Sequence, residues 1–119
     1  MTLNKIYHAL PLRLIADIAK LLCAEVISAR AELGIVVCGT GIGISIACNK
    51  IEGIRCALAH DHYTARMARE HNDANVLSLG GRTTGVEVAF EIVETYLTTP
   101  FAGAHHAARV AKLSSAYLC

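Results

Sequence analysis

The sequence predicts an α/β fold in which helices cover both faces of a parallel sheet. Three short apolar runs are typical of buried strands: Ile35–Cys38, Ile54–Ala59 and Val76–Leu79. Segments with the apolar spacing of helices separate these runs. Because parallel strands need a crossover connection that is usually a helix, the alternation favours a three-layer α/β/α architecture. Ligands bind such sheets at the carboxyl ends of the strands.

Five segments have the pattern of amphipathic helices: Leu10–Arg30, Gly43–Asn49, Asp61–Glu70, Thr84–Leu97 and His105–Leu113. Pro11 suits the first turn of the first helix, and Asp61 is a good N-cap for the third. Thr84 and Glu87 have the spacing of a capping box. The helix that they open is expected to face the core with a stripe of four apolar residues, Val86, Phe90, Val93 and Leu97.

The composition predicts one domain that associates with further subunits. No linker or repeat divides residues 1–119, and this length suits a single core. The hydrophobic fraction of 54% and the mean hydropathy of +0.43 are high for such a short chain, so a second subunit is expected to cover part of the surface. The net charge of +1 and the aromatic fraction of 5% argue against a nucleic-acid-binding protein.

Cysteine usage indicates a reducing compartment. The five cysteines form an odd set without a Cys-x-x-Cys pair, and most lie in or beside apolar patterns: Cys23, Cys38, Cys48, Cys56 and Cys119. Charged residues interrupt the N-terminal apolar pattern, which argues against a secretory signal and against a membrane span. A cytoplasmic protein that does not bind membranes is therefore expected.

The segment from Cys38 to Gly43, Cys-Gly-Thr-Gly-Ile-Gly, is typical of an anion site. Its glycines let the backbone approach a ligand closely, and the helix that follows presents amides without intrahelical partners. Beside this helix start, Cys38 is expected to ionise more readily than a free thiol. A thiolate next to an amide cradle suits proton abstraction beside a carbonyl, because the amides stabilise the resulting enediolate.

Two common glycine motifs differ from this segment. The dinucleotide fingerprint needs G-x-G-x-x-G, and a P-loop needs a Gly-Lys-Ser/Thr end; neither pattern is present here. Taken alone, the glycines also fit a tight strand-to-helix turn, and Cys38 fits a buried core thiol. Their combination at the carboxyl end of a strand favours a functional site.

A second group of polar residues follows the helix Asp61–Glu70. The dipole at the end of that helix favours a protonated His71, which would suit a general acid. Alternatively, His71, Asn72 and Asp73 only cap the helix and form a turn. The helix runs away from the strand end that carries Cys38, so His71 is expected to serve the site of a neighbouring subunit.

Basic residues near the C-terminus suit a phosphate group. His105 and Arg109 are four residues apart and share a helical face, and together with Arg82 they form a candidate phosphate site. A solvated basic surface is the alternative. The histidine pairs at 60/62 and 105/106 suggest a metal site, but no cysteine or acid spacing supports one, and no metal is expected.

Together, these segments resemble the ribose-5-phosphate isomerase B and galactose-6-phosphate isomerase family. The matching stretches are Gly34–Lys50, Gly53–Arg55, Ala65–Leu77, Leu79–Arg82, Phe101 and His106–Val110. The resemblance implies a Rossmann-like fold. It also implies interconversion of aldose and ketose phosphates through a cis-enediolate, without a metal or an organic cofactor.

The resemblance implies a role for each residue of the glycine segment. Cys38 would be the base that moves the proton between C1 and C2. Thr40 and the backbone of Gly39, Gly41 and Gly43 would hold the enediolate.

The remaining candidates would bind or open the sugar phosphate. His71 would assist ring opening, Asn72 would bind sugar hydroxyls, and Arg82 and Arg109 would bind the phosphate. In the family, the glycine loop and the His-Asn pair of one site come from different chains. The resemblance therefore implies a homodimer or tetramer with the site at the subunit interface.

The chain departs from the family pattern in two places. Members begin with a strand that carries an Asp-His pair, followed by a helix, a second strand and a Tyr-Pro segment. This chain is expected to lack the usual first βα unit, and Met1–Leu10 is not expected to form the missing strand. His105 stands where members usually have a phosphate-binding arginine, and a neutral histidine is a weaker phosphate partner. A short or divergent member is therefore expected.

Three functional hypotheses follow. The first is an isomerase of ribose 5-phosphate and ribulose 5-phosphate, with a galactose-6-phosphate-type isomerase subunit left open. The second is a non-catalytic or obligate-partner subunit on the same scaffold, because of the N-terminal departure and His105. The third is a phosphate-binding or nucleotide-binding module.

Overall fold

Strands and helices alternate along the chain and build one parallel sheet, as the sequence predicts. The computed structural model describes residues 6–8 and 15–114. The strands are β1 (Ile6–His8), β2 (Gly34–Cys38), β3 (Cys56–Leu58) and β4 (Val76–Gly80), in the spatial order β1-β2-β4-β3. All three neighbouring pairs are parallel. The crossover connections therefore place the start of each helix that directly follows a strand at the carboxyl ends of the strands.

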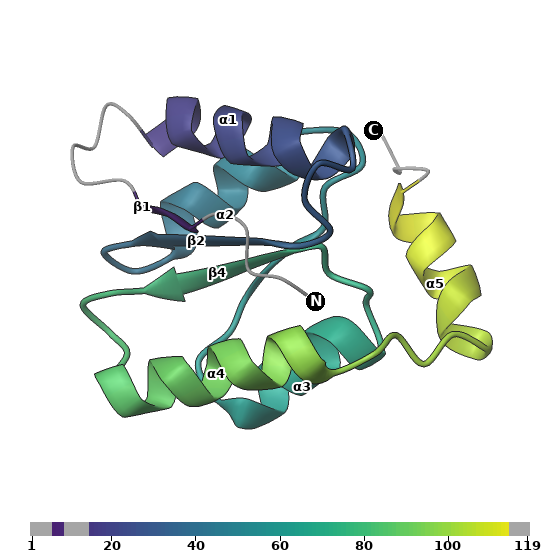
Figure 1. Ribbon diagram of the computed structural model, residues 1–119. Coiled ribbons are helices and arrows are strands. Elements are labelled where there is room, and N and C mark those ends of the chain that lie inside the picture. Colours follow the sequence, from purple (N-terminus) through teal and green to yellow (C-terminus); the bar gives the residue numbers. More distant parts are fainter. Residues whose placement is uncertain (1–5, 9–14, 115–119) are drawn as a thin grey trace.

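Two helical layers cover the sheet (Figure 1). The helices are α1 (Ile15–Ile27), α2 (Ile42–Asn49), α3 (His62–Glu70), α4 (Val86–Thr98) and α5 (His105–Ser114). Helices α1 and α2 pack on one face, and α3 and α4 pack on the other. Helix α5, drawn in yellow, stands at the end of the molecule where the strands begin.

Successive side chains of β2 point to opposite faces of the sheet, so this strand contributes to both hydrophobic cores. Val36 packs into the core beneath α1 and α2, whereas Ile35 packs into the core beneath α3 and α4. Ile92 and Tyr96 fill the second core, and the Tyr96 hydroxyl donates a hydrogen bond of 2.9 Å to the carbonyl of Ala74. The buried aromatic ring thus satisfies its polar atom.

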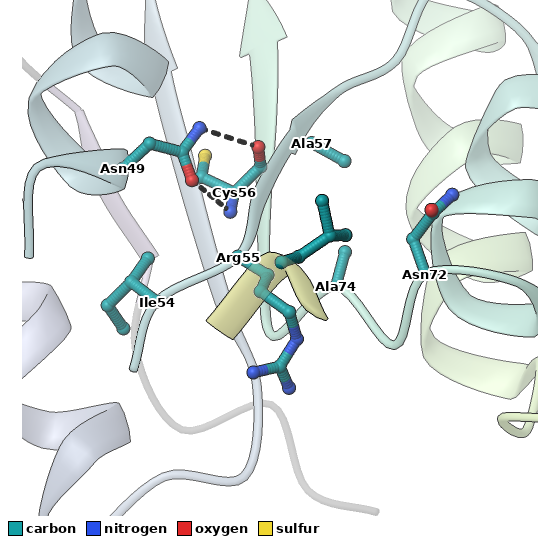
Figure 2. A pocket seen from close by; sticks show the side chains of 8 residues that line it. Asn49, Ile54, Arg55, Cys56, Ala57, Asn72 and Ala74 are labelled. Atoms are coloured by element: carbon teal, nitrogen blue, oxygen red, sulfur yellow. Dashed lines mark hydrogen bonds between the residues drawn. The ribbon is translucent and has the colours of Figure 1, made fainter. Parts of the chain in front are cut away.

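The strand predicted over Ile54–Ala59 is shorter and less buried than expected. It is the edge strand β3, and its residues are only half-buried. The side chain of Asn49 covers its open side like a short strand: its amide donates to the Cys56 carbonyl at 2.9 Å, and its oxygen accepts from the Cys56 amide at 2.8 Å (Figure 2). This pairing blunts the exposed edge.

Helix α4 differs from the prediction in its start and in its buried face. Its N-cap is Gly85 without a side-chain hydrogen bond, so the predicted capping box at Thr84 is wrong. The predicted core stripe is also wrong in part: Val93 and Leu97 reach the core only partly, while Val86 and Phe90 are 68% and 66% exposed. Ile92 and Tyr96 face the sheet instead, because the Tyr96 hydroxyl must reach its carbonyl partner.

The N-terminal part also corrects the prediction. Residues Ile6–His8 form the short strand β1, which pairs in parallel with Ile35–Val37, so Met1–Leu10, which was not expected to form the family's first strand, does contribute a strand at this edge of the sheet. Helix α1 lies within the predicted range, while Pro11 lies outside the described residues. The predicted N-cap Asp61 is confirmed and forms a capping box with Thr64. None of the helices in the described part of the chain is long and apolar enough to cross a membrane.

Candidate active site

Strands β2 and β4 end side by side, and the loops that follow them run together. The Gly81 amide donates to the Cys38 carbonyl at 2.7 Å, and the Arg82 amide donates to the Gly39 carbonyl at 2.9 Å. A Cβ added at Gly39 would lie 3.6 Å from the Arg82 Cδ, so the arginine side chain lies along the glycine loop. The structure therefore brings together Cys38, Gly39 and Arg82.

The sulfur of Cys38 faces the start of α2. The Gly41 amide donates a hydrogen bond of 3.2 Å to the Cys38 Sγ, and the Ile42 amide donates to the Thr40 hydroxyl at 3.2 Å. Cys38 is half-buried, whereas Cys23 has no exposed surface. Contact with the Cys48 thiol and burial raise the pKa of Cys23 well above its ordinary value. Cys23 is thus a buried core thiol, which is the alternative that the sequence left open for Cys38, whereas Cys38 itself is only half-buried.

Two glycines of the loop have different environments. Gly41 has a φ of 78°, and a Cβ there would lie 2.5 Å from the Leu58 Cδ1 and 2.9 Å from the carbonyl carbon of Leu79. Only glycine fits this position without strain. Gly43, in the first turn of α2, is exposed and has open space where a Cβ would point.

Ser78 holds the glycine loop from beneath, a contact that the sequence reasoning missed. Its fully buried hydroxyl donates a hydrogen bond of 2.6 Å to the carbonyl of Gly41. The available signal was a single polar residue inside the apolar run Val76–Leu79. The Ser78 hydroxyl thus fixes the carbonyl of Gly41. The amide of the same residue donates to the Cys38 sulfur.

The second group of predicted residues lies at the far end of α3. His71 is the C-cap of that helix, and the Asn72 side chain donates to the Met67 carbonyl at 3.2 Å. The rings of His71 and His106 stack with centroids 4.0 Å apart and planes at 15°. The centroid of the His105 ring also lies 4.0 Å from the centroid of the His106 ring. The turn after α3 and the start of α5 therefore form one cluster of polar side chains.

His106 is the buried member of this cluster, at 8% exposure, and was not among the predicted site residues. Burial lowers the pKa of His106, and electrostatic interaction with the neighbouring His105, His71 and Arg109 lowers it further. A neutral ring is therefore favoured between its basic neighbours. Arg109 lies on the exposed surface of α5, one turn after His105.

Two arginines hold the turn that carries His71 and Asn72. Asp73 has a φ of 46°, a left-handed conformation that aspartate tolerates better than most residues. Its carboxylate accepts from Arg69 Nη1 at 2.9 Å and from Arg55 Nη2 at 3.3 Å, and its carbonyl accepts from Arg55 Nε at 2.9 Å. These contacts fix the turn on both sides.

The two groups lie at opposite ends of the sheet (Figure 1). The first group lies at the carboxyl ends of the strands, where β2 and β4 end: Cys38, Thr40, Gly41, Gly43 and Arg82. The cluster of His71, Asn72, His105 and Arg109 lies at the amino ends, because α3 runs antiparallel to the strands. A five-residue strand spans about 15 Å, so one chain does not bring the two groups together.

A hollow of about 350 Å³ opens beside the second group (Figure 2). It is lined by Asn49, Ile54, Arg55, Cys56, Ala57, Asn72, Ala74 and Leu113. Asn49 and Asn72 stand on opposite sides of it, and Arg55 is already engaged with Asp73. Within residues 6–8 and 15–114, no three side chains of His, Cys, Asp or Glu are arranged to hold a metal ion.

Comparison with known proteins identifies the family. The sequence model described as Ribose/Galactose Isomerase matches residues 14–113, which is most of the chain. The chain belongs to the ribose/galactose isomerase family. The predicted family and three-layer fold are thereby confirmed.

Individual family members agree with this assignment. The chain is 45% identical over 82 residues to "Ribose-5-phosphate isomerase B" of Escherichia coli, covering 69% of this chain and 55% of that protein. It is 42% identical over 97 residues to "D-erythrulose-4-phosphate isomerase" of Pectobacterium atrosepticum, covering 82% and 64%. The solved structure of Clostridium thermocellum ribose-5-phosphate isomerase B superposes with a TM-score of 0.83 at 48% identity, covering 85% and 68%. The chain thus spans between about a half and two thirds of the length of these relatives.

Proposed function

We propose that this chain forms a homo-oligomeric sugar-phosphate isomerase that interconverts ribose 5-phosphate and ribulose 5-phosphate. The observation that carries the proposal is the hydrogen bond from the Gly41 amide to the Cys38 Sγ, in a loop that lies within the residues matched by the family model. This contact points the sulfur at the start of α2, and the thiolate is the form of a cysteine that acts as a base. The names of the ribose-5-phosphate isomerase relatives support the choice of substrate.

The reaction would begin with ring opening. His71 would donate a proton to the ring oxygen as the ring C1–O bond breaks. The C1 hydroxyl would lose its proton to solvent water, from which His71 regains one, and the sugar would open to an aldehyde with its carbonyl at C1. The Cys38 thiolate would then take the proton from C2, and the electron pair of that C–H bond would form the C1–C2 double bond. The charge moves to O1, where Thr40 and the amides at the start of α2 stabilise it.

The second half-reaction returns the same proton. The hydroxyl proton on O2 passes to O1, the Cys38 thiol protonates C1, and O2 becomes the ketose carbonyl. The thiolate is regenerated and nothing is oxidised or reduced overall. Arg82, beside the glycine loop, would bind the phosphate together with Arg109 and His105.

We infer that each complete site takes its two groups from two chains. The Cys38 loop and the His71 turn lie at opposite ends of one chain, so a second copy must supply the missing group. Exposed apolar side chains beside the glycine loop support such a contact: Ile42 and Ile46 on α2 are 52% and 55% exposed. Burying them against a second copy would stabilise the dimer that the chemistry needs.

Mixed oligomers test both claims. Cys38→Ala and His71→Ala chains are each expected to lose activity, the former by about a hundredfold to ten-thousandfold. Co-expressed, they form heterodimers in which one of the two sites has an intact Cys38 and an intact His71. About a quarter of the wild-type ketose formation should therefore return, since half of randomly mixed dimers are heterodimers with one good site each.

Two results would contradict this proposal. No recovery in mixed oligomers would mean that both groups act within one chain. A Cys38→Ala chain with wild-type turnover of ribose 5-phosphate would exclude the thiol as the base.

His105 supports a second candidate function, an obligate-partner subunit. His105 is exposed at the start of α5, and by the family resemblance it stands where members usually have a phosphate-binding arginine, for which a histidine is a weaker substitute. A subunit of this kind would need a related chain to complete its phosphate site. Full activity of the purified homo-oligomer with ribose 5-phosphate, but not with galactose 6-phosphate, would exclude both this candidate and a six-carbon specificity.

A further inference from the structure

Ser78 is a polar residue at the centre of the sheet. It lies in β4, between β2 and β3, and its side chain is fully buried. Leu77 and Leu79 face the core beneath α3 and α4, so Ser78 faces the layer of α1 and α2. There its hydroxyl donates the 2.6 Å hydrogen bond to the Gly41 carbonyl, at the start of α2. The sheet therefore contacts the glycine loop through a buried polar side chain.

The Gly41 carbonyl does not need this hydroxyl as its hydrogen-bond donor. It also accepts the first hydrogen bond of α2, from the Ser45 amide at 3.3 Å. Burying a hydroxyl instead of an apolar group has a desolvation cost, and alanine at position 78 would leave the carbonyl with its helical donor. The distinct contribution of the Ser78 hydroxyl is therefore the position of the peptide unit that joins Gly41 to Ile42.

The other end of that peptide unit leads to Thr40. Its N–H, which belongs to Ile42, donates to the Thr40 hydroxyl oxygen at 3.2 Å. Because the oxygen accepts this hydrogen bond, the hydroxyl proton of Thr40 is left to donate elsewhere. Thr40 is exposed and lies two residues from Cys38, so this proton is available to a ligand at the carboxyl end of the sheet.

We propose that Ser78 is a positioning residue for the Thr40 hydroxyl. In the proposed function, on which this inference rests, Thr40 stabilises the charge on O1 of the enediolate. Ser78 fixes the carbonyl of the peptide unit between Gly41 and Ile42, the N–H of the same unit fixes the Thr40 oxygen, and the Thr40 proton is thereby directed to O1. Hydrogen bonds in such a chain strengthen one another. A donor held in this way needs no reorganisation as the charge develops.

Steady-state kinetics of Ser78→Ala with ribose 5-phosphate test the proposal. Turnover should fall about tenfold, which is less than the loss of about a hundredfold expected when Thr40→Val removes the donor itself. KM should stay within about twofold of the wild-type value, because the charge on O1 develops only after the substrate is bound. Turnover within about twofold of wild type, or a loss confined to KM, would overturn the proposal.

A double-mutant cycle separates positioning from general destabilisation. If Ser78 acts through Thr40, Ser78→Ala should slow the Thr40→Val chain by less than about twofold. Tyr96→Phe is the matched control, because it removes another buried hydroxyl that donates to a carbonyl, that of Ala74 at the opposite end of the sheet. Any effect of Tyr96→Phe on turnover should be the same fold-change in both backgrounds. An equal loss from Ser78→Ala in both backgrounds would overturn the proposal and leave Ser78 with a structural role.

Hydrogen exchange of the Ile42 amide, followed by NMR without substrate, gives a readout that does not depend on turnover. This amide should exchange about threefold or more faster in Ser78→Ala than in Tyr96→Phe, since only the first change releases its peptide unit. The same exchange rate in both variants would overturn the proposal even in an active enzyme. A wild-type chain without turnover of ribose 5-phosphate would instead overturn the proposed function, and the exchange rates would still show whether Ser78 fixes the peptide unit that holds Thr40.

Discussion

The two ends of the sheet hold their polar groups by different means. At the carboxyl end, backbone atoms of neighbouring loops bind one another, and Ser78 anchors the Gly41 carbonyl from the core. At the amino end, side chains hold the polar group in place: Arg55 and Arg69 donate hydrogen bonds to the Asp73 carboxylate, and the His106 ring stacks on the His71 ring. The first arrangement leaves amides fixed in space, and the second leaves side chains fixed relative to one another.

This difference agrees with the chemistry assigned to each end. A charge that develops on oxygen is best stabilised by donors that need no reorganisation, which a locked backbone provides. A proton donor and a phosphate clamp need side chains with defined orientation, which ion pairs and stacking provide. In the proposed function each end is half of a site, and substitutions should affect the two ends in distinct ways.

The largest effect on stability is expected at the carboxyl end, from Gly41→Ala. The new Cβ would meet the backbone of Leu79 and would require alanine at a φ of 78°, so about 3 kcal/mol of unfolding free energy should be lost. Gly43→Ala is the matched comparison, with open space and helical backbone, and should gain about 0.5–1 kcal/mol. Urea unfolding of both variants measures the difference. Equal effects would mean that the loop is not locked as described.

A smaller effect is expected at the amino end, from Asp73→Ala. This change leaves two partly buried guanidinium groups without their carboxylate and places alanine at a φ of 46°, so about 2–3 kcal/mol should be lost. Asp73→Asn keeps an acceptor and tolerates the backbone, and should lose about 1 kcal/mol. Turnover should fall in the same order if the turn positions His71. Asparagine and alanine variants with the same unfolding midpoint would contradict a stabilising role of the contacts of Arg55 and Arg69 with residue 73.

The smallest effect concerns pH and His106. Because its folded pKa lies below the ordinary 6.5, the unfolded chain binds more protons between these two values, and stability should rise with pH across that interval. The facing groups His71, His105, Arg109 and Glu70 set the size of the effect. The unfolding midpoint in urea, measured from pH 5 to pH 8, should decrease as the pH falls below 6.5, and His106→Phe should flatten this decrease. If the unfolding midpoint depended on pH in the same way in both proteins, His106 would not be the source of the pH dependence.

Local signals predicted the elements well. Helix α3 begins at the predicted N-cap because Asp61 and Thr64 lie three residues apart and satisfy each other's backbone amides. The end of β2 at Cys38 follows from the glycines that come directly after it. Such features depend on neighbours in the chain, so they can be predicted without knowing the fold.

Predictions that depended on distant partners were less successful. The exposure of Val86 and Phe90 could not be predicted, because a helix with apolar residues on two sides can pack either of these two sides against the sheet. The edge position of β3 depends on the order of strands, and the short β1 had no clear alternation to reveal it. Likewise, no local pattern indicates that Arg55 and Arg69 converge on one carboxylate.

The amino-acid sequence by itself determined the alternation of strands and helices, the glycine loop at Cys38 and the His71 turn, because each is encoded within about ten neighbouring residues. The tertiary structure decided which residues support them: the Ser78 hydroxyl reaches Gly41 across 37 positions, and Arg55 reaches Asp73 across 18. It also decided that the Cys38 loop and the His71 turn lie at opposite ends of the sheet. A parallel sheet with antiparallel helices sends the ends of β2 and α3 to opposite edges, so the proposed mechanism needs a second chain to bring thiol and imidazole together.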